Sequence, residues 1–238
     1  MPQVTDRQAR QAVHHAAYNG YDDVVTYLLE AAQKAPTKDR NGRLPMHWAA
    51  YRGHVPVIKA LLDNIPAQID KWRAVADKDK VGCTPVHAAA TSGSFVAVET
   101  LCAFNDSAAS VKDAQGRRPL HCAAINGHIS CAVSLLKASP GEINAQDDRG
   151  QTALHKAASA GYDELVEVLL DSDADPMITD AKGRTAAMIA CRKGDLESLQ
   201  AILGHSPAAA KVADKKGRTL AHHAAASGNL PLLQYLQL

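Results

Sequence analysis

Hydrophobic residues recur along the chain in short groups with the spacing i, i+1, i+4 and i+5. This spacing places the members of a group on one side of a helix, and it predicts a helix that is buried along that side. Alanine pairs lie upstream of the groups, which predicts a preceding helix that neighbours can approach closely. Three clear groups are Val24, Val25, Leu28 and Leu29; Val57, Ile58, Leu61 and Leu62; and Leu165, Val166, Leu169 and Leu170.

The helix pairs repeat, because three residue types return with one period. The period is 33 or 34 residues, apart from one step of 40. Such a period is the sequence signature of a repeat protein, in which each unit buries its apolar face against its neighbours. The glycine column is Gly20, Gly53, Gly93, Gly127, Gly161, Gly194 and Gly228; the histidine column is His14, His47, His87, His121, His155, Met188 and His222; and the aspartate column is Asp6, Asp39, Asp79, Asp113, Asp147, Asp180 and Asp214.

Each unit opens with turn chemistry, since the glycine of an Asp-x-x-Gly stretch supplies the positive φ that a turn needs. Pro45, Pro85 and Pro119 then stand where a first helix begins, a position that favours proline. A column glycine ends that helix. The sequence thus predicts seven repeats at about residues 6–38, 39–78, 79–112, 113–146, 147–179, 180–213 and 214–238.

The motifs Thr84-Pro-Val-His87-Ala-Ala and Thr152-Ala-Leu-His155-Lys-Ala-Ala, with this period, resemble the ankyrin repeat over about residues 6–238. The resemblance implies an all-α fold: a solenoid of seven helix-turn-helix units with short β-hairpin loops, forming a single domain over residues 1–238. It also implies that the column histidines are structural and bond the hairpin backbone.

Two parts of the chain depart from the repeat pattern. Repeat 2 carries an insertion within residues 63–78 that contains Trp72. Insertions in repeat proteins are often functional, but we favour an extended helix end with Trp72 tucked against repeat 2 or 3. The end repeats replace pattern residues with Gln11-Ala12 and Gln237, which favours polar capping units.

Composition and charge exclude several classes of protein. The chain is 46% hydrophobic and 21% charged with a net charge of +1, so nothing global indicates nucleic acid as a partner. No apolar run approaches a membrane span, and the N-terminus lacks the apolar region of a signal peptide. The five cysteines fit no disulfide framework, which favours a reduced compartment, the cytoplasm or also the nucleus.

No motif in the sequence indicates catalysis or metal binding. Metal ligands must converge to about 2 Å from one ion, whereas the column histidines lie on successive helices, about 8–10 Å apart. Phosphate loops, nucleophile elbows and zinc-protease motifs are missing. We therefore expect no catalytic residues, no cofactor and no bound metal.

An aspartate–arginine ladder with a spacing of four residues runs along the hairpins, including Arg43 and Arg117. We interpret the ladder as a row of local ion pairs. Each exposed pair contributes about 0–1 kcal/mol to the stability of the fold. The alternative is a basic row for an acidic partner.

The exposed face of each first helix is where proteins of the ankyrin family usually contact their partners. By its register, this face carries the residues one, four and five positions after the column histidine; among them are Cys122, Ile189 and His223. Repeats 1 and 2 place aromatic residues on this face. The candidate partner-binding residues are His15, Tyr18, Arg43, Trp48, Tyr51, Arg52, Arg117, Ile125 and Lys156.

Trp48 and Tyr51 are expected to anchor the partner, with little effect on stability. The competing interpretation makes them packing residues of the repeat 1–2 junction.

The resemblance implies a protein–protein interaction module or scaffold that binds another protein on its concave face, and we expect a monomer without nucleic-acid or membrane partners. Gly42-Arg-Leu-Pro-Met-His-Trp48 and Leu154-His-Lys-Ala-Ala158 also resemble the gankyrin family of proteasome assembly chaperones, which implies a proteasomal ATPase subunit as partner. A third interpretation is the recognition domain of a larger enzyme, such as a palmitoyltransferase or a kinase.

Overall fold

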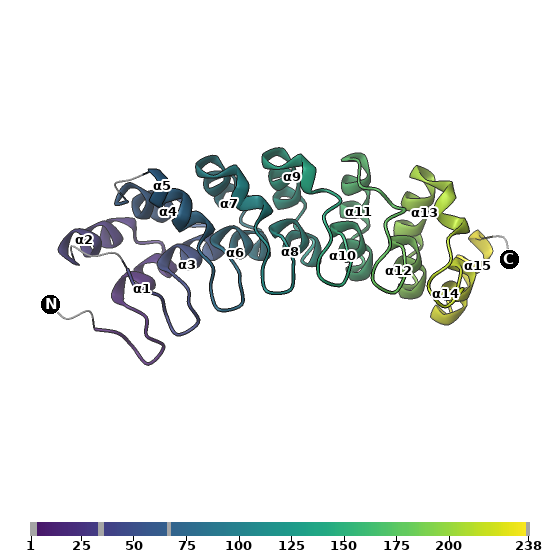
Figure 1. The fold of residues 1–238 in the computed structure, drawn as a ribbon, viewed down its shortest axis with the longest axis horizontal. Helices are drawn as coiled ribbons and strands as arrows, with labels where there is room; N and C mark the ends of the chain where they lie inside the picture. Colours follow the sequence, from purple (N-terminus) through teal and green to yellow (C-terminus); the bar gives the residue numbers. More distant parts are fainter. Residues whose placement is uncertain (1–3, 33–35, 66–67, 237–238) are drawn as a thin grey trace. The chain divides into compact units, whose positions relative to one another are not determined.

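The computed structural model describes residues 4–32, 36–65 and 68–236, with only the backbone for Gln68 and Ile69. Over these residues the regular structure is helical, and the one β-bridge joins Thr5 to Gln11 (Figure 1). The predicted all-α repeat fold is confirmed. The hairpin loops close through backbone bonds such as Asp39 N–H to the Arg43 carbonyl, 2.9 Å, without forming strands in the described ranges.

Helices come in pairs, one pair for each predicted repeat, with one additional helix. The first helices are α1 (Ala12–Asn19), α3 (Pro45–Arg52), α6 (Pro85–Ser92), α8 (Pro119–Ile125), α10 (Ala153–Ala160), α12 (Ala186–Lys193) and α14 (Leu220–Ser227). The second helices are α2 (Asp22–Ala32), α4 (Val55–Asp63), α7 (Phe95–Phe104), α9 (Ile129–Ala138), α11 (Asp163–Asp171), α13 (Leu196–His205) and α15 (Leu230–Tyr235). The additional helix is α5 (Gln68–Ala76), and short 3₁₀ turns cover Asp106–Ser110, Pro140–Glu142 and Pro207–Lys211.

The ends of the first helices follow from the repeat motif. Thr84 caps α6 because its hydroxyl accepts the His87 N–H, and Pro85 occupies the first turn. At the other end Gly93 has φ 83°, a left-handed conformation that glycine adopts without steric cost. The motif therefore encodes both ends of the helix.

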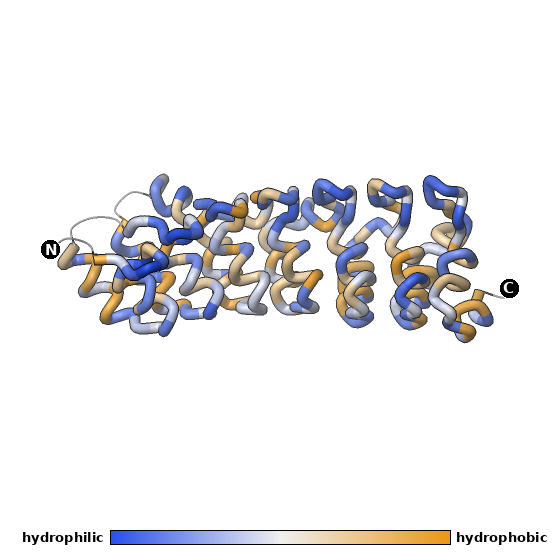
Figure 2. Tube along the Cα trace, turned by 90° about the horizontal axis from the view of Figure 1, so that it is seen from below, coloured by the Kyte–Doolittle hydropathy of each residue, from blue (hydrophilic) through white to orange (hydrophobic). Residues whose placement is uncertain are grey.

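Contacts divide the chain into two compact units. Unit 1 comprises Met1–Cys122 and Ser130–Ser139, and unit 2 comprises Ala123–Ile129 and Pro140–Leu238. Within unit 1, α3 packs against α1 and α6, and α4 against α7; within unit 2, α12 packs against α10 and α14, and α11 against α13. Hydrophobic and hydrophilic segments alternate along the helices of each unit (Figure 2). The expectation of one domain over the whole chain stays a prediction.

The core of each unit consists of the apolar groups that the sequence indicates. Val57, Ile58 and Leu62 on α4 are fully buried, and Leu165, Val166 and Leu169 on α11 are equally closed to solvent. The alanine pairs Ala49–Ala50 on α3 and Ala157–Ala158 on α10 are also fully buried, which lets neighbouring first helices approach closely.

Two expectations about irregular parts of the chain are wrong. The insertion forms the separate helix α5 rather than an extension of α4, and Trp72 is 48% exposed instead of tucked away. Val75 anchors α5, because its side chain is fully buried and α5 packs against α6 and α7.

The first repeat also lacks the polar outer face expected of a cap. Val24 on α2 is 41% exposed, whereas its equivalent Val57 is fully buried by a preceding repeat. At the other end His222 is exposed, unlike His155. Gln237, which is expected to belong to a polar cap, lies outside the described residues. No helix in the described ranges has the length and apolar character needed to cross a bilayer.

Candidate functional site

The column histidines hold one repeat to the next. In repeat 3, Nδ1 of His87 accepts the Thr84 N–H at 3.2 Å, so Nε2 carries the proton and donates to the Arg117 carbonyl at 3.0 Å. His155 makes the equivalent bond to the Arg184 carbonyl, also at 3.0 Å. Burial lowers the pKa of both imidazoles, because desolvation outweighs the carbonyls that favour the charged form. Both ring nitrogens are thereby engaged in structural bonds.

Four aspartates of the ladder, Asp39, Asp113, Asp180 and Asp214, are buried at the base of their hairpins, whereas Asp6 is exposed. Asp113 is typical: Oδ1 accepts the N–H groups of Gln115 and Arg117, at 2.8 and 2.9 Å, and Oδ2 accepts the Arg117 Nε–H at 2.8 Å. Burial alone would raise the pKa of Asp113, but the Arg117 guanidinium and the backbone N–H groups outweigh it and lower the pKa. These contacts are the local ion pairs expected from the sequence.

In repeats 1, 2, 5 and 7 the residue after the column position contacts the hairpin aspartate of its own repeat. The helix register did not indicate this contact. His15 bonds Asp6 at 3.1 Å, Trp48 Nε1 donates to Asp39 at 3.3 Å, and Lys156 Nζ lies 2.6 Å from Asp147. His223 contacts Asp214 at 3.2 Å and is buried. The expectation that this position faces solvent is therefore wrong for His223, and likewise for the buried residues Cys122 and Ile189.

An aromatic and cationic cluster lies at the junction of repeats 1 and 2. The guanidinium of Arg43 stands 3.9 Å from the centroid of the Trp48 ring, and Tyr18 meets Trp48 edge-on at 5.4 Å. Arg52 stacks over the outer side of Tyr18 at 5.0 Å. Cation–π contacts of this kind are attractive at such distances. Trp48 thus lies at the centre of the cluster, half-buried, while Tyr18 and Arg52 form its outer part.

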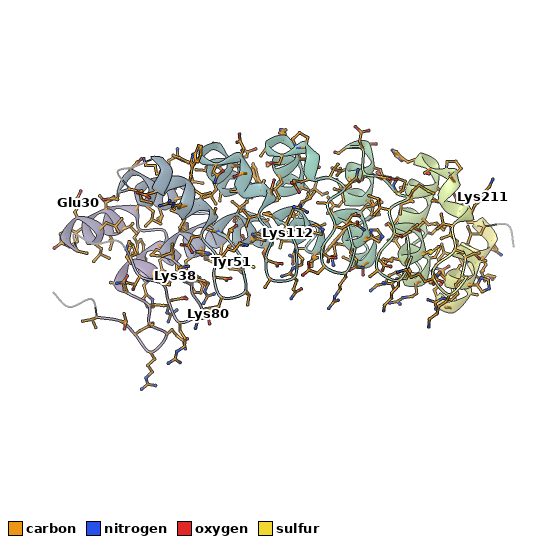
Figure 3. All side chains as sticks on the ribbon, viewed as in Figure 1. Glu30, Lys38, Tyr51, Lys80, Lys112 and Lys211 are labelled. Atoms are coloured by element: carbon orange, nitrogen blue, oxygen red, sulfur yellow. The ribbon has the colours of Figure 1, made fainter. Side chains whose placement is uncertain are left out.

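Tyr51 projects from α3 on the side of unit 1 where Lys38 and Lys80 also lie (Figure 3). Its exposed fraction is 45%, and that of Tyr18 is 38%. The two tyrosines occupy equivalent positions, each two residues before a column glycine. They present neighbouring aromatic rings to solvent.

Three further candidates, Arg117, Ile125 and Lys156, make no contact with this cluster that the structure records. Arg117 belongs to unit 1 and is paired with Asp113. Ile125 and Lys156 belong to unit 2, where Ile125 is half-buried and the Lys156 side chain is only 12% exposed. The structure therefore joins Tyr18, Arg43, Trp48 and Arg52 into one cluster but does not bring all nine candidates into it.

One further set of contacts escaped the sequence reasoning. The residue after a column glycine reaches back to the preceding repeat: His54 Nε2 bonds the Tyr18 carbonyl at 3.1 Å, and Asn229 Nδ2 donates to the Gly194 carbonyl at 2.8 Å. These residues differ in type from repeat to repeat, so they form no column that a repeat alignment would detect.

Three of the buried cysteines are not activated as nucleophiles. All five are free thiols. Burial raises the pKa of Cys102 and Cys191 to about 12 and that of Cys131 to about 11. A thiol of this kind stays protonated, and the thiolate is the reactive form. Within the described residues, no three metal-binding side chains are grouped as a metal site requires.

Comparison with known proteins places the repeats in a family. A family model described as ankyrin repeats, in three copies, matches residues 2–73, 70–147, 103–180, 132–215 and 172–237. A search of the curated proteins found no match. Since the overlapping matches cover almost the whole chain, the protein belongs to the ankyrin-repeat family.

Proposed function

We propose that this chain binds a partner protein through a first-helix surface made of Tyr18, Tyr51 and Arg52. Ankyrin repeats are generally protein–protein interaction modules. The observation that supports this surface is the pair of exposed tyrosines at equivalent positions of adjacent repeats. Arg52 lies beside them and has no ion pair in the described part of the chain.

The residue types of the first-helix surface are more typical of partner binding than of packing within the fold. Tyrosine and arginine are enriched among residues that dominate binding energy, where truncation costs about 2 kcal/mol or more. Thr91 and Ser159 occupy the position of Tyr51 in repeats 3 and 5, so the fold does not need an aromatic ring there. Trp48, Arg43 and His15 have a supporting role in this proposal, because each bonds a hairpin aspartate.

A comparative capture experiment tests the surface. Wild-type protein, the variant Tyr51→Ala with Arg52→Ala, and the control Tyr27→Ala are each immobilised and exposed to the same cell extract. Tyr27 is a suitable control because it is 70% exposed on the second helix α2. We expect at least one protein to bind wild type and control but to be lost with the double variant. Equal recovery by all three would contradict the proposal.

The identity of the captured protein also tests the narrower proposal. Recovery of proteasomal ATPase subunits, lost with the double variant, is expected of a gankyrin-like assembly chaperone, and their absence would reject that role. The full-length reading frame tests the third interpretation, in which the chain is the recognition domain of a larger enzyme. In the form we propose, the chain is monomeric, has no catalytic role and acts in the cytoplasm or the nucleus.

A further inference from the structure

The hairpins of the last three repeats bury their column aspartates, while Asp148 beside Arg149 is exposed. The side chains of Asp147 and Asp180 are 3% exposed, and that of Asp214 is 1% exposed. In repeat 6, both oxygens of Asp180 are occupied: Oδ1 accepts the N–H groups of Lys182 and Arg184, each at 2.9 Å, and Oδ2 accepts the Arg184 Nε–H at 2.9 Å. A ligand approaching the hairpins therefore does not meet these carboxylates.

The cations of the same hairpins face outward. The residue two positions after the column aspartate is exposed and cationic in the last three repeats, where it is Arg149, Lys182 or Lys216. Their charged groups form no ion pair within the described residues of unit 2. In the first four repeats the same position is neutral, with Gln8, Asn41, Val81 and Gln115. The change of residue type is confined to hairpins that share unit 2.

The opposite sign of charge gathers on the second helix of repeat 5. Asp163, Glu164, Glu167 and Asp171 are all exposed on α11, which has no lysine or arginine. Unit 2 is therefore polarised, with cations on the hairpins and carboxylates on a second helix. Such a field attracts an acidic ligand to the hairpins and repels it from the helix.

The hairpins also keep the cations in register. The Ala181 N–H donates to the Arg149 carbonyl at 2.9 Å, and the Lys215 N–H donates to the Lys182 carbonyl at 3.2 Å. Equivalent cations follow the spacing of neighbouring helices, about 10 Å. A polyproline II chain is extended, with three residues per turn and a rise of about 3.1 Å per residue, so every third side chain returns to the same side at about this spacing.

We propose that Arg149, Lys182 and Lys216 form a basic hairpin surface that binds an extended acidic segment of a partner protein, with a carboxylate at every third residue. This site lies in unit 2 and goes beyond the first-helix surface of unit 1. A peptide fits better than a nucleic acid, because duplex DNA carries one charge per roughly 1.7 Å and would bring surplus phosphates against the exposed Asp148.

Fluorescence anisotropy tests the proposal with a labelled Gly/Ser peptide of about twelve residues that carries glutamate at every third position. The variant is Arg149→Gln, Lys182→Gln and Lys216→Gln, which introduces the residue type that repeats 1 and 4 have at this position. The control is Lys59→Gln, Lys137→Gln and Lys211→Gln. These lysines are exposed and the control removes the same charge; Lys211 lies near α13, away from the hairpins (Figure 3). Circular dichroism checks that both variants fold.

We expect the hairpin variant to lose at least about tenfold in affinity and the control to stay within about twofold of wild type. Tyr51→Ala should leave peptide binding unchanged, which separates this site from the first-helix surface. Equal losses in both triple variants, no binding of wild type at about 1 mM peptide, or equal affinity for a peptide with its glutamates clustered would overturn the proposal. Tighter binding of single-stranded oligothymidylate, lost in the same variant, would assign the surface to nucleic acid instead.

Discussion

At the scale of single residues, the position after the column histidine makes a contact that the helix register does not predict. Trp48, Lys156 and His223 all follow a column position, and all contact the hairpin aspartate of their own repeat. The histidine and aspartate columns are visible in the sequence, because each recurs with the same residue type apart from Met188. The sequence did not predict this contact, because an indole, an ammonium group and an imidazole reach the same carboxylate in different ways.

The structure therefore separates Trp48 from Tyr51. Trp48→Ala should lower the free energy of unfolding by about 2 kcal/mol, because it removes a half-buried ring that contacts Arg43 and Tyr18 and donates to Asp39. Tyr51→Ala should stay within about 0.5 kcal/mol of wild type, since its ring is exposed. Urea melts measure both values. The opposite order would mean that Tyr51 packs the junction and Trp48 is free to bind a partner.

The buried imidazoles predict a pH dependence of stability. The pKa of His155 is lowered in the folded chain from an ordinary value of 6.5, so below about pH 6.5 the unfolded chain binds more protons than the folded chain. Stability should be complete above about pH 6.5 and fall as the pH drops towards the folded-state value. Asp113 does not contribute in this window, because its pKa is lowered from 3.8.

Urea midpoints at about pH 7.5 and pH 5 measure this loss, and His155→Met provides the comparison. Methionine is accommodated at this column position in repeat 6, where Met188 is fully buried. The variant should lose less stability than wild type between the two pH values. A wild-type midpoint that does not fall on acidification would show that the histidines do not resist protonation.

At the scale of the element, the repeat unit is the part of the fold that the sequence predicts best. Each first helix has its start and end encoded in a few residues, such as Thr84, Pro85 and Gly93 in repeat 3. Helix α5 was not predicted, because it interrupts the repeat and has no equivalent in the other units. The apolar outer face of α2 was missed for a related reason: Val24 matches the core position of Val57, and the pattern does not indicate that a neighbour is missing.

The hairpin glycines have two roles that a pair of substitutions separates. Gly82 and Gly217 both have positive φ, 79° and 72°, so alanine is strained at either position by about 1–2 kcal/mol. An added Cβ at Gly82 would also lie 2.5 Å from the backbone nitrogen of Ala114, whereas one at Gly217 would meet nothing within 4 Å. The Ala114 backbone cannot retreat without losing its 3.0 Å bond to the Val81 carbonyl.

Gly82→Ala should therefore destabilise the chain by at least about 1 kcal/mol more than Gly217→Ala in denaturant melts. Losses of the same size in both variants would mean that backbone conformation alone selects these glycines, and that the close approach of successive hairpins adds nothing.

At the scale of the whole molecule, the surfaces were harder to predict than the core. The apolar groups and columns repeat, and repetition made them visible in one sequence. The exposed residues differ between repeats, as with the neutral Gln115 and the cationic Lys182 at one hairpin position. The sequence alone left the ladder open between ion pairs and a basic row. It does not show that the column aspartates of the last three repeats are buried while Arg149, Lys182 and Lys216 are exposed.

Stability should also be local, because each repeat contacts its neighbours rather than a common core. Leu232 on α15 is fully buried, whereas Leu230 on the same helix is 61% exposed. Leu232→Ala should cost about 2–5 kcal/mol and Leu230→Ala less than about 0.5 kcal/mol. Hydrogen exchange should then quicken in α14 and α15 of the Leu232→Ala protein while the amides of α3 and α6 keep their wild-type protection. If protection instead fell equally in all these helices, the chain would unfold as one all-or-none unit, and the nearest-neighbour account of its stability would fail.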